Sequence, residues 1–399
     1  ETVVDAHPLV LIEPSEGGSQ EHAEEEEFDL DRIRPDLAEV LERIGTGLDE
    51  NRPDAVARRR KTNQRTVREN VDDLCDPDSF IEYGALVLAA QRRRRSMDDL
   101  IKMSPGDGMV CGLGQVNGLY FPEDKARTAV LAYDYTVFAG TQGGMNHKKT
   151  DRVLEIAEEA QLPIVFFTEG GGGRPGDTDG TGVAGLDVPT FHTFAKLSGL
   201  APRIAINSGR CFAGNAALFG CSDITIATAN STIGMGGPAM IEGGGLGTFT
   251  PEEVGPMEMQ TKNGVVDIAV KDEGEAVATA KQVLGYFQGR LDDWEACDQR
   301  LLRRLIPENR LRVYDIRPVI EAIADTGSFI ELKRDNAIGM LTGFVRIEGR
   351  PMGLIANNPH HFAGAIDSPA YRFHALPRPH EWQWGGTVEL GEFTDGENL

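Results

Sequence analysis

Short apolar runs and longer amphipathic segments alternate along the middle of this chain. The apolar runs are five to eight residues long, which is a typical length for a buried strand. In the segments between them apolar residues recur every three or four positions, and Val153, Ile156 and Ala160 share one helical face. Strands that alternate with helices predict an α/β fold with helical crossovers. The predicted strands are 109–116, 128–133, 163–167, 203–207 and 223–227, and the predicted helices are 148–160, 189–199, 251–259 and 273–287.

Two of the predicted strands run into glycine-containing bends. The strand at 163–167 is followed by four consecutive glycines at 170–173, and the strand at 203–207 is followed by Ala213 and Gly214. Glycine has no Cβ and accepts positive φ, so a ligand can approach the backbone N–H groups closely. Such bends can hold a carbonyl oxygen that becomes negative during a reaction. The alternatives are a plain strand-to-helix turn for the glycine run and close helix packing for the second bend.

Charge narrows the choice of partners. The net charge is −23, which disfavours nucleic acid and anionic membranes. Two basic runs, at 58–61 and 92–95, are local exceptions. Each run is either a solvated face or a contact for a phosphorylated small ligand.

The five cysteines form no Cys-x-x-Cys pair, so neither a zinc ribbon nor a disulfide framework is indicated. We expect buried thiols in a reducing compartment, and therefore a cytoplasmic protein. No apolar stretch reaches the roughly 18 residues of a membrane span, and no metal site is expected because the histidines lack further ligands at suitable spacing.

The chain contains an internal sequence repeat. The segment 71–82, which ends in Ser-Phe-Ile-Glu, is matched by 320–331, and Phe-Ala-Gly at 138–140 returns at 362–364. Self-similarity over such a long period indicates duplicated domains. We therefore expect one complete domain followed by the start of a second. The expected parts are an acidic, disordered lead-in at 1–34, a first domain at 35–300, an incomplete second domain at 301–370 and an unplaced tail at 371–399.

The ordered set of these motifs resembles the carboxyltransferase (beta) component of biotin-dependent acyl-CoA carboxylases, the acetyl-CoA and propionyl-CoA carboxylase group. The resemblance covers roughly 40–366 and implies the crotonase-like fold, a spiral of βαβ units in each domain. Its motifs are Thr-Val-Arg-Glu-Asn with Asp-Pro-Asp-Ser-Phe-Ile-Glu (66–82), Gly-Asp-Gly-Met-Val-Cys-Gly (106–112), Glu-Gly-Gly-Gly-Gly-Arg (169–174), Phe-Ala-Gly-Asn (212–215), Gly-Gly-Pro-Ala-Met-Ile (236–241), Arg-Val-Tyr-Asp-Ile-Arg (312–317) and Ile-Ala-Asn-Asn-Pro (355–359).

The resemblance implies transfer of a carboxyl group from N1 of biotin to the α-carbon of an acyl-CoA. Both organic groups pass through an oxyanion, so backbone donors can carry the reaction without a side-chain base. Biotin would be carried on another protein or segment, since no Met-Lys-Met motif is present. The implied partners are acyl-CoA, biotin carboxylase, the biotin carboxyl carrier and further copies of the chain. The implied catalytic residues are Gly172, Gly173, Ala213 and Gly214, and the implied cofactor contacts are Arg58, Arg60, Gly171 and Arg174.

Two other functions remain open at this point. A hydratase or isomerase acting on acyl-CoA would share the fold and would need a carboxylate base, for which Glu169 is the candidate beside a glycine bend. A non-catalytic subunit of a carboxylase complex would fit the incomplete second domain. If the chain is a carboxyltransferase, we expect it to bind acyl-CoA but to transfer carboxyl groups poorly when it is alone.

Overall fold

The computed structural model describes residues 29–180 and 188–365. The chain divides into two compact units, 1–42 and 43–399. The described part of the first unit contains most of helix α1 (Pro35–Gly45), and none of this helix's residues is buried. Most of the predicted lead-in lies outside the described residues.

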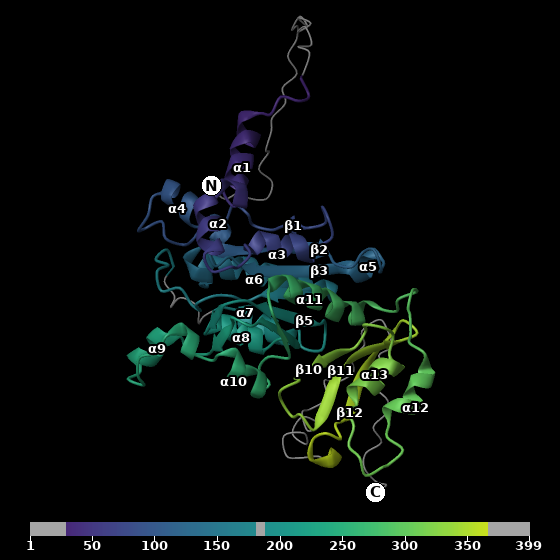
Figure 1. The fold of residues 1–399 in the computed structure, drawn as a ribbon. Helices are drawn as coiled ribbons and strands as arrows, with labels where there is room; N and C mark the ends of the chain where they lie inside the picture. Colours follow the sequence, from purple (N-terminus) through teal and green to yellow (C-terminus); the bar gives the residue numbers. More distant parts are fainter. Residues whose placement is uncertain (1–28, 181–187, 366–399) are drawn as a thin grey trace, which may run out of the picture. The chain divides into compact units, whose positions relative to one another are not determined.

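The second unit is built on a seven-stranded sheet in the order β1-β2-β3-β4-β5-β7-β9 (Figure 1). The strands from β3 to β9 are parallel, whereas β1, β2 and β3 pair antiparallel. A separate two-stranded parallel sheet consists of β6 and β8. The bounds are β1 (Ile81–Glu82), β2 (Met109–Gln115), β3 (Arg127–Tyr133), β4 (Ile164–Phe167), β5 (Arg203–Asn207), β6 (Arg210–Phe212), β7 (Ile224–Thr228), β8 (Thr232–Gly234) and β9 (Ile268–Val270).

Helices cover both faces of the main sheet. Alternate side chains of a strand point to opposite faces, so Val130 packs towards α3 (Val67–Leu74) and α11 (Glu273–Gln288), whereas Leu131 packs towards α6 (Gly144–Ala160) and α7 (Thr190–Lys196). Buried parallel strands with helices on both faces are the expected solution for such apolar runs. The other helices of this part are α2 (Pro53–Arg60), α4 (Met97–Met103), α5 (Glu123–Ala126), α8 (Gly214–Gly220), α9 (Pro238–Gly243) and α10 (Met257–Lys262).

The structure confirms the predicted strands to within about a residue at each end and corrects one helix. The helix predicted at 251–259 is instead a 3-10 turn, Pro251–Glu253, followed by α10. Gly255, with φ of 63°, and Pro256 separate the two, because neither the left-handed glycine nor the proline continues a helix. At the start of α3, Thr66 and Glu69 form the capping box that their spacing predicts.

The internal sequence repeat corresponds to a repeat in the structure. The three-stranded antiparallel sheet β10 (Ile330–Leu332), β11 (Met340–Ile347) and β12 (Arg350–Asn357) repeats the arrangement of β1, β2 and β3. Arg68 pairs with Glu82 at the start of the first copy, and Arg317 pairs with Glu331 in the second. In both Phe-Ala-Gly turns the central alanine has a positive φ, of 54° and 55°. Helix α12 (Leu302–Leu305) and helix α13 (Arg317–Ile323) precede this sheet, and α13 packs on it (Figure 1).

These parallels support, as a proposal, a division into a first domain at 35–300 and the start of a second at 301–370. The predicted tail at 371–399 lies outside the described residues.

Candidate active site

The two glycine-containing bends lie in contact at the carboxyl ends of β4 and β5. Gly170 and Cys211 form a parallel bridge, in which Gly170 N donates to Arg210 O (2.7 Å) and Phe212 N donates to Gly170 O (2.9 Å). A Cβ built on Gly172 would lie 2.6 Å from the Cβ of Ala213, so only glycine allows this approach. Parallel strands end at one edge of a sheet, which brings together bends that are about forty residues apart in sequence.

Most N–H groups of the bends are already used within the protein. Gly171 N donates to Ala139 O (3.2 Å), Gly172 N to Asn215 Oδ1 (3.0 Å) and Ala213 N to Gly234 O (3.1 Å). Within residues 29–180 and 188–365, the N–H groups of Gly173 and Gly214 donate to no protein acceptor. These two are therefore the predicted donors that remain available to a ligand.

Two further residues, Asn215 and Gln142, hold the first bend in place. Asn215 is fully buried, and its Nδ2 donates to Gly140 O (3.3 Å) and Thr168 O (3.2 Å) while its Oδ1 accepts from the first bend. Gln142 N donates to Gly172 O (2.8 Å), and its side-chain Nε2 donates to Tyr133 Oη (2.9 Å). Asn215 stands inside the Phe-Ala-Gly-Asn motif, which was the one available signal for it.

The bend at Ala213 has an unusual backbone. Its φ is 50° and its ψ is −119°, outside the regions that a residue with a Cβ ordinarily occupies. Such conformations cost about 1–3 kcal/mol and persist where the surrounding structure holds them. Here Ala213 N donates to Gly234 O and the facing bend packs directly against its Cβ. Gly214, the first residue of α8, directly follows this strained residue and is half-buried.

Arg174, predicted as a cofactor contact, is a buried anchor at the end of the glycine run. Its Nη2 pairs with Asp107, and its Nε donates to Asp177 Oδ1 (2.8 Å). Burial raises the pKa of Asp107 to about 6, although the Arg174 guanidinium opposes this shift. The remaining nitrogen, Nη1, has no hydrogen-bond partner among the described residues. Arg174 thus serves mainly to fix the backbone that follows Gly173.

The other two predicted arginines are solvent-exposed. Arg60 pairs with Glu69, and Arg58 points its side chain into solvent. The arginine between them, Arg59, is buried and forms an ion pair with Glu169, the residue before the glycine run. The run of like charges at 58–61 gave no sign in the sequence that its second arginine faces inward.

A hollow of about 560 Å³ lies against the segment that follows the glycine run. Its floor is apolar, and its charged residues are Arg43, Arg92, Arg93 and Asp179. Thr178 N and Asp179 N both donate to Ala90 O (2.8 and 3.1 Å), which joins the wall of the hollow to that segment. The apolar lining is Leu86, Val87, Leu88, Ala89, Ala90, Met97 and Met145.

The described residues hold no group of three or more His, Cys, Asp or Glu side chains that is arranged to bind a metal ion. None of the helices in that part of the chain has the length and apolar character needed to cross a membrane. All five cysteines are free thiols, and burial raises the pKa of Cys75 and Cys211 to about 12.

The chain is similar to a known family and to several known proteins. The model of the carboxyl transferase domain family matches residues 58–372. The propionyl-CoA carboxylase beta chain of Saccharopolyspora erythraea is 28% identical over 358 residues, which are 84% of this chain and 62% of that protein. The methylmalonyl-CoA carboxyltransferase 12S subunit of Propionibacterium freudenreichii subsp. shermanii is 29% identical over 343 residues, 83% of this chain and 62% of that protein.

Among solved structures, a single-chain, multi-domain long-chain acyl-CoA carboxylase is similar with a TM-score of 0.82 and 57% identity, over 85% of this chain and 34% of that one. This chain therefore spans about three fifths of the curated relatives and one third of that structure. The matches confirm the predicted crotonase-like α/β class and the resemblance to acyl-CoA carboxylase beta subunits. The chain belongs to the carboxyl transferase domain family.

Proposed function

We propose that this chain supplies the acyl-CoA half of a biotin-dependent carboxyl transfer. The observation that carries the proposal is the contact between two bends that leaves the N–H groups of Gly173 and Gly214 without an acceptor among the residues that the structure describes. The α-carbon of a thioester becomes nucleophilic only when its proton is removed and negative charge moves to the thioester oxygen. A preorganised backbone donor stabilises that oxygen more than it stabilises the neutral carbonyl, and this difference lowers the barrier.

Each bend contributes in its own way. Gly173 directly precedes Arg174, whose buried ion pairs fix the backbone, and Gly214 follows the strained Ala213. We assign one donor to the thioester oxygen and the other to the ureido oxygen of biotin. Biotin, when bound, supplies the carboxyl group. The second backbone N–H group is suited to donate to the ureido carbonyl oxygen of biotin. The removal of one donor of this kind costs about 10²–10³ in rate in other enzymes.

The structure gives no support to a hydratase reaction in which Glu169 is the base. Both carboxylate oxygens of Glu169 accept hydrogen bonds from Arg59, and only 8% of the residue is exposed. A general base must reach the proton that it abstracts, and this carboxylate is turned towards a buried guanidinium instead. Its position argues for carboxyl transfer over hydration.

We propose the basic hollow as the contact for the phosphorylated part of acyl-CoA. Arg92 and Arg93 use their backbone N–H groups to bind Asp179, which leaves their guanidinium groups at the hollow for an anion. The apolar floor fits the uncharged part of such a ligand. Arg58 is a second candidate, whereas Arg60 must first leave Glu69.

The partners are also proposals. A biotin carboxylase and a biotin carrier, on other chains or segments, would complete the reaction, and the chain would form a homo-oligomer. A related structure is described as a transcarboxylase 12S hexamer with a multienzyme core. We place the protein in the cytoplasm, because the five free thiols suit a reducing compartment. Light scattering after size-exclusion chromatography, with and without a biotin carboxylase, tests the assembly.

Decarboxylation of malonyl-CoA tests the proposed function without biotin. The bond between the carboxyl carbon and the α-carbon breaks, CO2 leaves, the electron pair moves to the thioester oxygen, and water then protonates the α-carbon to give acetyl-CoA. We expect the chain to accelerate this step and to show no hydration of crotonyl-CoA. An absence of acceleration, or hydration that is lost in Glu169→Gln, would contradict the proposal.

A further inference from the structure

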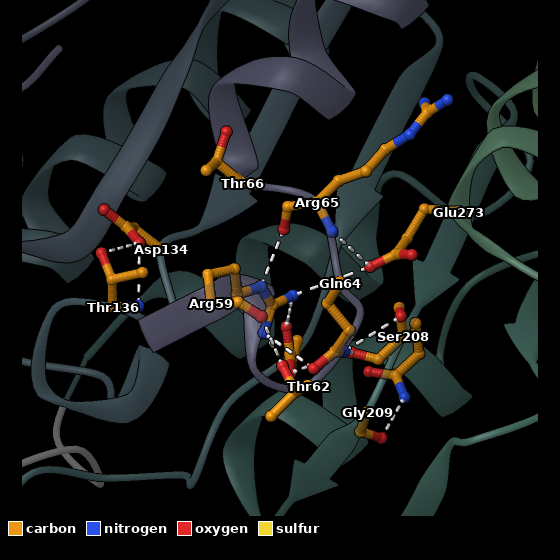
Figure 2. Close-up of polar contacts among 12 residues, drawn as sticks. Arg59, Thr62, Gln64, Arg65, Thr66, Asp134, Thr136, Ser208, Gly209 and Glu273 are labelled. Carbon is orange, nitrogen blue, oxygen red and sulfur yellow. Dashed lines mark hydrogen bonds and ion pairs between the residues drawn. The ribbon is translucent and has the colours of Figure 1, made fainter. Parts of the chain in front are cut away.

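The segment 59–65 runs from the last two residues of α2 to the residue before Thr66, and we call it the bracket because it contacts the approaches to both bends. It holds two buried polar side chains, Arg59 and Gln64, with 8% and 7% of each residue exposed. Polar groups this deeply buried are costly unless they are fully bonded. Figure 2 shows them surrounded by partners from distant parts of the chain.

Arg59 binds the residue at which the first bend begins. Its Nη1 donates to Glu169 Oε1 (2.9 Å) and its Nη2 to Glu169 Oε2 (2.5 Å), so the pair is bidentate. Arg59 also donates within the bracket, from Nε to Arg65 O (2.7 Å) and from Nη1 to Gln64 Oε1 (3.1 Å). Glu169 directly precedes Gly170, so the ion pair fixes the start of the glycine run.

Gln64 reaches the approach to the second bend as well. Its Nε2 donates to Ser208 O (3.0 Å), to Ser208 Oγ (3.1 Å) and, at longer range, to Glu169 Oε1 (3.3 Å). Ser208 follows β5 and leads into β6, whose end is the second bend. A Cβ on Gly209 would lie 2.4 Å from Glu169 Oε1, so the two approaches meet at this point. One amide side chain therefore bonds to both.

The bracket is itself attached to the body of the protein. Arg65 N donates to Glu273 Oε1 (3.2 Å) at the start of α11, and Thr66 caps α3. Both helices pack on the main sheet through fully buried side chains. The bracket thus links this rigid part of the protein to the approaches of both bends.

From these contacts we propose that Arg59 and Gln64 are positioning residues, which set the distance between the Gly173 and Gly214 donors. This inference rests on the proposed function. Four consecutive glycines have the greatest conformational freedom of any backbone and no side chains to restrict it. Bonds within the run hold Gly170, Gly171 and Gly172, and the two ends of the run are held by Arg174 on one side and by the bracket on the other.

Two variants and a matched control test the proposal in the full chain. Gln64→Leu removes the shared donor at similar volume, and Glu169→Gln removes the charge that Arg59 binds. The control is Asp223→Asn, which makes the same carboxylate-to-amide change in another arginine pair, in which Arg203 is buried and Asp223 is half-buried. That pair lies at the opposite end of β5 from Ser208, so it touches neither bend.

We expect kcat for malonyl-CoA decarboxylation to fall by about tenfold or more in both variants, with KM changed less than about threefold, because misplaced donors affect the transition state more than ground-state binding. Asp223→Asn should keep kcat within about twofold while it lowers the melting temperature. If Arg59 and Gln64 have a purely structural role, all three variants should have a lower melting temperature. At assay temperatures well below that melting temperature, kcat should then be unchanged in all three. That result would overturn the proposal.

Hydrogen exchange separates this inference from the proposed function. In Gln64→Leu we expect the amides of 168–174 and 208–214 to exchange about tenfold faster, with those of β2 and β3 unchanged. If wild type lacks decarboxylation but these amides respond, the proposed function fails and the bracket stands. If both segments keep their wild-type exchange rates, the bracket is refuted whatever the activity.

Discussion

Substitution of alanine for Gly172 tests whether the contact between the bends is as close as the structure has it. Gly172 has φ of +84°, and a Cβ there would lie 2.6 Å from the Cβ of Ala213 and 3.2 Å from Phe212 O. The left-handed backbone costs an alanine roughly 1–2 kcal/mol, and a methyl forced into a packed contact costs roughly 1–3 kcal/mol. We therefore expect Gly172→Ala to lower the free energy of unfolding by roughly 2–5 kcal/mol.

The same substitution should also reduce catalysis. If the bend moves to accept the methyl group, Gly173 N moves with it, and a displacement of about 1 Å at a catalytic group costs about 10² in rate. Thermal unfolding and malonyl-CoA decarboxylation measure the two effects.

The control for this variant is Gly220→Ala at the end of α8, where a Cβ meets no atom within 4 Å. That change should be neutral or should stabilise by up to roughly 1 kcal/mol. If Gly172→Ala matched the control in both assays, the two bends could not be in the contact described.

Three further predictions follow from particular contacts. Burial lowers the pKa of His147 to about 4, so its neutral form is favoured by folding; the stability is complete above about pH 6.5 and falls as the pH drops towards 4, by up to roughly 3 kcal/mol. Urea titrations across this range should show a shallower loss in His147→Gln, and equal losses would contradict the assignment. Arg346 donates to the carbonyls of Gly285, Gly289 and Gly349, so Arg346→Met should lower the free energy of unfolding by roughly 3 kcal/mol, whereas an unchanged melting temperature would show that these bonds do not hold the second sheet to α11. Thr66→Ala should cost about 1 kcal/mol in the same measurement and Thr66→Ser almost nothing, because only the serine keeps a capping oxygen; equal losses would rule out the cap.

The order of strands and helices was predictable because it depends on the local spacing of apolar residues. Parallel strands with both faces covered are apolar throughout, and β3 to β7 are therefore conspicuous in the sequence. The contact between the two bends is a consequence of this topology, since successive parallel strands end at one edge of the sheet. The error at 251–259 also has a local cause, because helical spacing was given more weight than Gly255 and Pro256.

The availability of individual donors was not predictable. Whether an N–H group is free depends on acceptors that come from elsewhere in the chain, and the Asn215 side chain takes Gly172 N while leaving Gly173 N. It is equally hard to predict from the sequence which residues of a short helix face the core. Of three consecutive arginines in α2, only Arg59 faces inward, and its partner Glu169 lies more than a hundred residues away. Local patterns carry no information about such long-range pairs.

The central claim is that the bends stabilise a negative oxygen of a CoA thioester, and a crystal structure of the chain with bound malonyl-CoA tests it most directly. The account predicts that the thioester oxygen accepts a hydrogen bond from Gly173 N or Gly214 N, at about 2.7–3.1 Å. A thioester bound in another part of the molecule, with neither N–H directed at its oxygen, would contradict the account.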